Sequence, residues 1–408
     1  MPGGPQMRGG VRAQGQASAR KRSFLVGTQT VEEGYDWQPP ALTALGGGGQ
    51  FNPWTLQGTG WLQRLWFEFT WTSAGSGMTA LTSTDMPWLL IANVQLNDVN
   101  NEAIFGPFDG YTWMLTNKFG GYYDWDDPST RQSFAFASSA TAGTATFILM
   151  IPLEIVNRDP IGAVASVNNT ATLTVLVSMN TYATLGNATN PTSSSFSVIG
   201  TQEFYWEPRK QDKQGREIAG APPANGTTQY WTQGSVPVNP GSINQQLITG
   251  LGYPFRSYLF LQRLGAQAAA TSNRVAGDTG WPATFNSLKF EANMLLTQYD
   301  KALWIDEMAR KTGYVGATDV RTAGALPGRE QGVYGLFFNT DFFKKTVGGE
   351  TRRSYLVTSP GSNFIVNMTV GGASAGNLYS VVNYVAPGGG GASAGGKNTD
   401  TAMLTGGS

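Results

Sequence analysis

The sequence predicts an all-β protein made of two β domains in tandem. Short segments that alternate apolar and polar residues recur along the chain, and clusters of Gly, Pro, Asn and Asp separate them. A polar stretch with several prolines, 208–241, divides the chain into two portions of similar size. With 408 residues, the chain is longer than one ordinary domain. Many strands joined by turn-rich connections favour a sandwich, a barrel or a jelly roll.

The alternating segments are typical of half-buried antiparallel strands. In the segment 65–71, the apolar residues that share one face are Leu65, Phe67, Phe69 and Trp71. The same period of two recurs in the segments 172–179, 288–294 and 364–370. The segment 144–155 is apolar on both faces. We therefore expect it to lie between two packed layers or at a contact between subunits.

One helix is expected at 300–313. Its apolar side is formed by Trp304, Ile305, Met308 and Ala309. Leu303 lies toward the charged side, Asp300 can cap the first turn, and Gly313 can end the helix. The pattern predicts a surface helix packed on a β domain, and core packing explains Trp304 and Met308 better than a cofactor site does.

The composition excludes several kinds of chemistry. The chain has no cysteine and no histidine, so disulfides, cysteine or histidine zinc sites, haem ligation and Ser-His-Asp catalysis are impossible. A glycine-rich stretch at 391–397 resembles the start of a phosphate-binding loop, but Asn398 stands where a Ser or Thr is required. We expect no catalytic residues, no cofactor and no metal.

The charge pattern favours assembly over nucleic-acid wrapping. The 27 basic residues balance the 27 acidic ones, and only 13% of residues are charged, about half of the ~25% typical of soluble domains. Polar neutral residues and aromatic side chains must therefore cover much of the surface. Such surfaces suit contacts with other subunits.

Both ends of the chain are expected to be flexible. The N-terminal arm, 1–22, has no acidic residue and five basic ones: Arg8, Arg12, Arg20, Lys21 and Arg22. These charges can attract nucleic acid, an acidic lipid surface or an acidic patch on a neighbour, without sequence readout. The C-terminal tail, 388–408, is too poor in large apolar residues to offset the entropy of ordering it.

An aromatic loop is the main candidate binding site in the first half. Tyr122, Tyr123 and Trp125 lie there among the carboxylates of Asp124, Asp126 and Asp127. The loop is best interpreted as packing against a partner subunit, and sugar binding on its aromatic rings is the main alternative. A pair of carboxylates acting as a glycosidase acid and base is the least favoured hypothesis.

Short motifs, in a fixed order over both halves, resemble those of the double jelly-roll major capsid proteins of tailless icosahedral, tectivirus-like phages and viruses. In the first half the similar segments are Asn93 to Asn101, Asp109 to Tyr111, Leu115 to Lys118, Ile151 to Glu154, Gly162 to Val164 and Leu173 to Val175. In the second half they are Leu303-Trp304 with Arg310, Gly332 to Tyr334 and Phe337 to Asn339. The resemblance covers about residues 55 to 385.

The resemblance implies two tandem eight-stranded jelly rolls with a few short helices and a purely structural role. It divides the chain into an arm, a first jelly roll with its lead-in, a linker, a second jelly roll and a tail: 1–22, 23–207, 208–241, 242–387 and 388–408. The chain would form homotrimers, made in the host cytoplasm, that act as pseudo-hexameric capsomers in the icosahedral shell of a virion.

The resemblance also implies further partners, and one alternative function remains open. Penton and minor capsid proteins are expected beside the shell, and an internal membrane or the genome is expected near the arm. The arm lacks the amphipathic helix that relatives place near their membrane. The alternative is a two-domain β-sandwich protein that binds carbohydrate or attaches to a host through the Tyr122 to Asp127 loop.

Overall fold

The computed structural model describes most of the chain between 21 and 387. The described residues are 21–43, 48–56, 58, 60–74, 85–122, 127–130, 132–136, 143–155, 160–166, 172–185, 193–223, 226–239, 241–249, 252–264, 286–290, 294–299, 301–314, 328–330, 332–339, 354–357, 363–370 and 376–387. They form three β-sheets, two α-helices and short 3-10 turns, so the predicted all-β class is confirmed.

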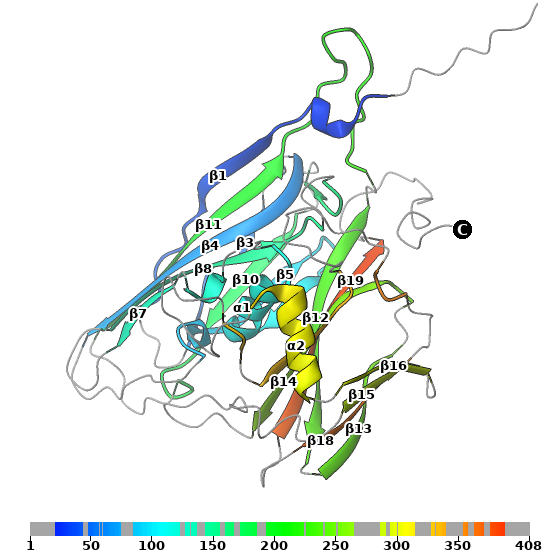
Figure 1. Cartoon of the computed structure of the whole chain (residues 1–408). Helices are drawn as coiled ribbons and strands as arrows, with labels where there is room; N and C mark the ends of the chain where they lie inside the picture. Colours follow the sequence, from blue (N-terminus) through cyan, green and yellow to red (C-terminus); the bar gives the residue numbers. More distant parts are fainter. Residues whose placement is uncertain are drawn as a thin grey trace, which may run out of the picture.

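The first sheet has six antiparallel strands (Figure 1). Its order is β1 (Thr30–Trp37), β11 (Ser193–Tyr205), β4 (Gly60–Ala74), β8 (Gly143–Pro152) and β7 (Ser133–Phe136), and β9 (Val164–Ser166) also pairs with β4. The predicted alternation at 65–71 is confirmed within β4. Its four inward residues are fully buried, whereas Trp66 and Glu68 point outward.

The second sheet has nine strands and runs through both halves of the chain. Its order is β17 (Val333–Phe337), β14 (Phe255–Leu264), β19 (Gly376–Pro387), β12 (Thr227–Val238), β6 (Ala103–Phe108), β5 (Ile91–Asn97), β10 (Thr174–Met179) and β2 (Gly49–Gln50), with β3 (Trp54–Thr55) also paired to β10. The two halves meet where β12 pairs with β6 in parallel, at Trp231 and Phe105. Part of the expected linker is therefore strand.

The third sheet has four antiparallel strands and belongs to the second half. Its order is β13 (Gly241–Thr249), β18 (Asn363–Val370), β15 (Asn286–Phe290) and β16 (Met294–Tyr299). The predicted strand at 364–370 lies within β18. The prediction of one strand over 288–294 is wrong, because β15 ends at Phe290 and its antiparallel partner β16 begins at Met294.

Helix α1 (Gly110–Phe119) lies between the two sheets of the first half, and all ten of its residues are buried. The Asp109 carboxylate caps its start by accepting a hydrogen bond from the Thr112 amide at 2.7 Å. The indole of Trp113 packs edge-on against Phe67 of the six-stranded sheet, 5.1 Å between centroids, and 6.2 Å from Phe105 of the nine-stranded sheet. The helix therefore fills the space between the layers.

Helix α2 (Lys301–Thr312) covers the nine-stranded sheet in the second half, as predicted (Figure 1). Trp304 and Met308 are buried, and the Trp304 indole donates a hydrogen bond to the Gly335 carbonyl at 2.8 Å. Leu303 is exposed, as its place on the charged side predicts, and Gly313 follows the helix with a φ of 78°. The apolar stripe of α2 is core packing.

Candidate functional site

The outer face of the six-stranded sheet carries rows of hydroxyl groups. The pairing of β11, β4 and β8 aligns two rows across the strands: Ser195, Thr72 and Thr144, then Ser197, Thr70 and Thr146. All six side chains are exposed or half-buried, and none of them carries a charge. Neutral hydroxyls bind water when the face is free and can bind a covering protein surface equally well. We call this the outer face.

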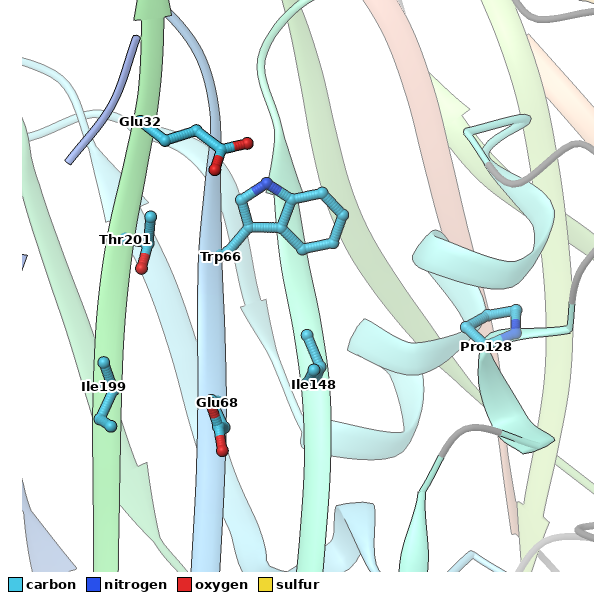
Figure 2. Close-up of a pocket in the computed structure, with 7 residues that line it drawn as sticks. All are labelled: Glu32, Trp66, Glu68, Pro128, Ile148, Ile199 and Thr201. Carbon is cyan, nitrogen blue, oxygen red and sulfur yellow. The ribbon is translucent and has the colours of Figure 1, made fainter. Parts of the chain in front are cut away.

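A hollow of about 310 Å³ opens on the same face (Figure 2). Two further rows cross the sheet at this point, Ile199, Glu68 and Ile148, then Thr201, Trp66 and the buried Met150. The residues that line it are Glu32, Trp66, Glu68, Pro128, Ile148, Ile199 and Thr201. Figure 2 shows the Glu32 side chain pointing toward the Trp66 indole. Ile148, from the segment expected between layers or at a subunit contact, is 49% exposed in the single chain.

The charges around the hollow are unbalanced. Arg64 forms an ion pair with Glu203 at 3.2 Å, and the Trp66 indole donates to the same carboxylate at 3.2 Å. Glu32 and Glu68 are exposed, and no described basic side chain forms an ion pair with either. The hollow therefore combines an aromatic ring and two isoleucines with two acidic groups that are open to a cation.

One end of the six-stranded sheet holds a buried carboxyl group. Glu154 accepts a hydrogen bond from the Tyr205 hydroxyl at 2.8 Å, and Arg64 lies 3.8 Å away. Burial raises the pKa of the Glu154 carboxyl to about 7, although the hydrogen bonds from Tyr205 and Gln63 act in the opposite direction. Burial and the nearby Glu154 also raise the pKa of the Tyr205 hydroxyl. This end of the sheet is sensitive to pH.

A fully buried charge cluster connects the two halves. The Lys118 ammonium of α1 lies 2.7 Å from Asp127 and 2.8 Å from Glu330, and none of the three side chains in these ion pairs is exposed. The Tyr111 hydroxyl donates to Glu330 at 2.7 Å, and the Tyr314 ring lies 5.0 Å from the ammonium. Because buried charges are costly without partners, this cluster fixes how the halves pack.

A second buried network contains Tyr122, the first residue of the predicted aromatic loop. The Tyr122 hydroxyl donates to Gln229 at 2.8 Å, and the Arg256 guanidinium donates to both groups. Tyr123 and Trp125 lie outside the described residues. The structure thus places Tyr122 in an intramolecular contact between the halves, and its role in a partner or glycan interface stays a prediction.

Two residues of the N-terminal arm are described, and both contact one hairpin. Lys21 lies 3.3 Å from Glu217, and Arg22 lies 3.4 Å from Asp212. The Arg22 amide also donates to the Glu217 carbonyl at 2.8 Å. Arg8, Arg12 and Arg20, like the tail 388–408, lie outside the described residues. The described end of the arm therefore pairs with acidic groups.

Neither a metal site nor a membrane-spanning helix is found within the described part of the chain. No group of three acidic side chains there is arranged to hold a metal ion. None of the described helices has the length and apolar character needed to cross a membrane.

Sequence reasoning missed the outer face and the charge cluster. Ser and Thr residues at alternate positions gave a signal for the hydroxyl rows, but only the register of three strands brings them side by side. Lys118 and Glu330 are separated by 212 residues, and no local pattern connects them.

The fold matches solved viral capsid proteins. No model of a known protein family matches the chain, and no curated protein matches its sequence. The major capsid protein of the Sulfolobus Turreted Icosahedral Virus superposes with a TM-score of 0.55 at 10% identity, covering 88% of this chain and 97% of that one. The Faustovirus major capsid protein superposes with a TM-score of 0.51 at 9% identity, covering 88% of this chain and 90% of that one. The chain thus has the fold of the double jelly-roll major capsid proteins of viruses.

Proposed function

We propose that this chain is a major capsid protein, a structural subunit without catalytic activity. The observation that carries the proposal is the likeness to capsid proteins over 88% of this chain and nearly the whole of theirs. A match of this extent supports a fold that is shared over most of both chains. The division into the domains 23–207 and 242–387, with β12 inside the intervening segment, is part of the proposal.

Assembly into trimers is the second part of the proposal. Two similar jelly rolls per chain give a trimer six similar walls, which can tile a lattice as a pseudo-hexamer. The hydroxyl rows of the outer face are uncharged, and Ile148 is exposed beside them. Both features support an outer face that a second copy of the chain covers in the trimer. The capsomers would then meet one another, and penton and minor capsid proteins, in the shell of a virion assembled after synthesis in the host cytoplasm.

The proposal is tested by particle mass and shape. Purified protein is examined by analytical ultracentrifugation over a range of concentrations and by negative-stain electron microscopy. Trimers with a pseudo-hexagonal outline, and shells under assembly conditions, are expected. A chain that stays monomeric at the highest concentration would contradict the proposal.

The role of the N-terminal arm is tested by deletion. Removal of 1–22 is expected to leave the trimer folded and to impair shell closure, because the arm connects neighbours or binds an internal membrane or the genome. A deletion of the same length from the tail, 388–408, serves as the control for shortening the chain. Normal particles from the arm deletion would show that the arm has no part in assembly.

A further inference from the structure

The hollow on the outer face has the chemistry of a receptor for an arginine side chain. Glu32 and Glu68 supply carboxylates that no described basic side chain pairs with. The Trp66 ring offers a face for a cation, and Ile148 and Ile199 can pack against the aliphatic stem. A planar guanidinium can bind one carboxylate with two hydrogen bonds while its stem lies on apolar surface, which a lysine does less well.

The same chain carries suitable arginines close to this hollow. The arm has no acidic residue, and its described end is anchored by Lys21 and Arg22 on the hairpin that contains Asp212 and Glu217. Glu32 follows Arg22 by ten residues in the sequence, so the anchor and Glu32 lie at most about 36 Å apart. The hollow therefore lies near the root of the arm.

The number of residues between each arginine and the anchored Arg22 determines whether that arginine can reach the hollow. Arg12 and Arg8 precede Arg22 by ten and fourteen residues, which allows spans of about 36 Å and about 50 Å. Arg20 precedes the anchor by only two residues and has a span of about 7 Å. A tethered segment of this length has an effective concentration of about 1 mM or more, which favours its own hollow over that of another copy in dilute solution.

We infer that in the unassembled chain its own N-terminal segment crosses the outer face and places Arg12 or Arg8 in the hollow, where the guanidinium pairs with Glu32 or Glu68. The contact covers an acidic and apolar surface with cationic side chains. It does not depend on the proposed function. One consequence does rest on that function: a sibling copy that covers the outer face must first displace the segment, which slows premature association.

The experiment uses the absence of cysteine in the natural chain. Val11→Cys and Ser197→Cys place one dye in the arm, between the two arginines, and one on the outer face beside the hollow. Energy transfer is measured on the full-length protein at a concentration where it is unassembled. High transfer is expected at about 0.01 M ionic strength, with a fall of about twofold or more at about 1 M as salt screens the contact.

Matched variants identify the partners. The pair Glu32→Gln and Glu68→Gln, or the pair Arg8→Gln and Arg12→Gln, is expected to lower the transfer as strongly as high salt does. Two controls should leave the transfer unchanged: Arg20→Gln, whose span is too short, and Glu102→Gln, an exposed carboxylate in the connection between β5 and β6 of the nine-stranded sheet. The substituted charged residues lie at exposed or terminal positions, Ser197 is half-buried on the outer face, and circular dichroism verifies that each variant is folded.

Three results would overturn the inference. Low transfer in the natural background at low salt would mean that the segment does not dock on the outer face. Transfer that survives the Glu32→Gln and Glu68→Gln pair would place the contact elsewhere. Transfer between singly labelled chains in a mixture, in place of transfer within one chain, would assign the occupant to a second copy. None of these readouts requires a shell, so they are independent of the capsid assays.

Discussion

The buried Glu154 carboxyl predicts an unusual dependence of stability on pH. Its pKa is about 7 in the folded chain and about 4.5 when exposed, because burial disfavours the charged form. A group whose pKa is raised by folding contributes its stabilisation fully below the unfolded pKa and loses it as the pH rises through the folded pKa. The free energy of unfolding should therefore fall between about pH 4.5 and pH 7.

The magnitude follows from the shift. One pKa unit corresponds to about 1.4 kcal/mol, so a rise from 4.5 to about 7 corresponds to about 3 kcal/mol. Glu154 is 2% exposed, and solvent screening does not reduce this figure much. Glu154→Gln keeps an oxygen that can accept the Tyr205 hydrogen bond but has no ionisable group. We expect the variant to lose the fall in stability and to exceed the natural chain at pH 8.

The assay is urea unfolding of both chains between pH 5 and pH 8, followed by tryptophan emission at one protein concentration, because assembly also stabilises the fold. Glu102→Gln, an exposed carboxylate, is the control and should retain the natural pH profile. Natural protein whose stability is flat or rises between pH 5 and pH 7, or an unchanged profile in Glu154→Gln, would refute the reasoning.

Three further predictions concern the junction, the outer face and a close backbone contact. Lys118→Met leaves two buried carboxylates without their cation, so the free energy of unfolding should fall by about 3–5 kcal/mol in urea titrations. Thr72→Lys adds a charge to the outer face and should reduce trimer formation in light scattering without changing circular dichroism, whereas Ala183→Lys, exposed after β10, should not. Gly110→Ala would place its Cβ 2.0 Å from the Trp88 carbonyl oxygen, so α1 must shift, and thermal unfolding should report a loss of about 1–3 kcal/mol or more.

The elements that the sequence predicted best have one face exposed to solvent and one face buried in the core. In β4 the alternation of inward aromatic residues with Trp66 and Glu68 is visible because one side contacts solvent. In α2 the apolar stripe stands against charged residues, and even the exposure of Leu303 could be predicted. Hydrophobic periodicity arises when one side of an element faces the core and the other faces water. It therefore predicts an element correctly where the element lies along that boundary.

The elements that periodicity missed have no such boundary. Helix α1 is buried on every side, and only the resemblance to capsid proteins indicated a short helix there. Strand β12 lies in the segment 208–241, which is predicted as a linker because it is polar, contains several prolines and has little periodicity. The strand begins with the polar residues Thr227, Thr228 and Gln229. These side chains are buried, and the Gln229 amide donates to the carbonyl of Pro152, at the end of β8, and to those of the two residues that follow. Hydropathy cannot distinguish a buried, hydrogen-bonded polar residue from an exposed one.

The low charge content leaves even fewer charges for the surface, because part of them is buried. Several charged side chains lie in the interior, where Lys118, Asp127 and Glu330 join the halves and Arg263 pairs with Asp85. Such ion pairs contribute little net stability, but breaking them is costly, so they favour one packing of the halves over others. The outer face, by contrast, relies on neutral hydroxyls that exchange water for protein at little cost. Under the proposed capsid function, a subunit built in this way would keep a fixed shape, and its outer face would associate weakly enough for misplaced copies to dissociate during assembly.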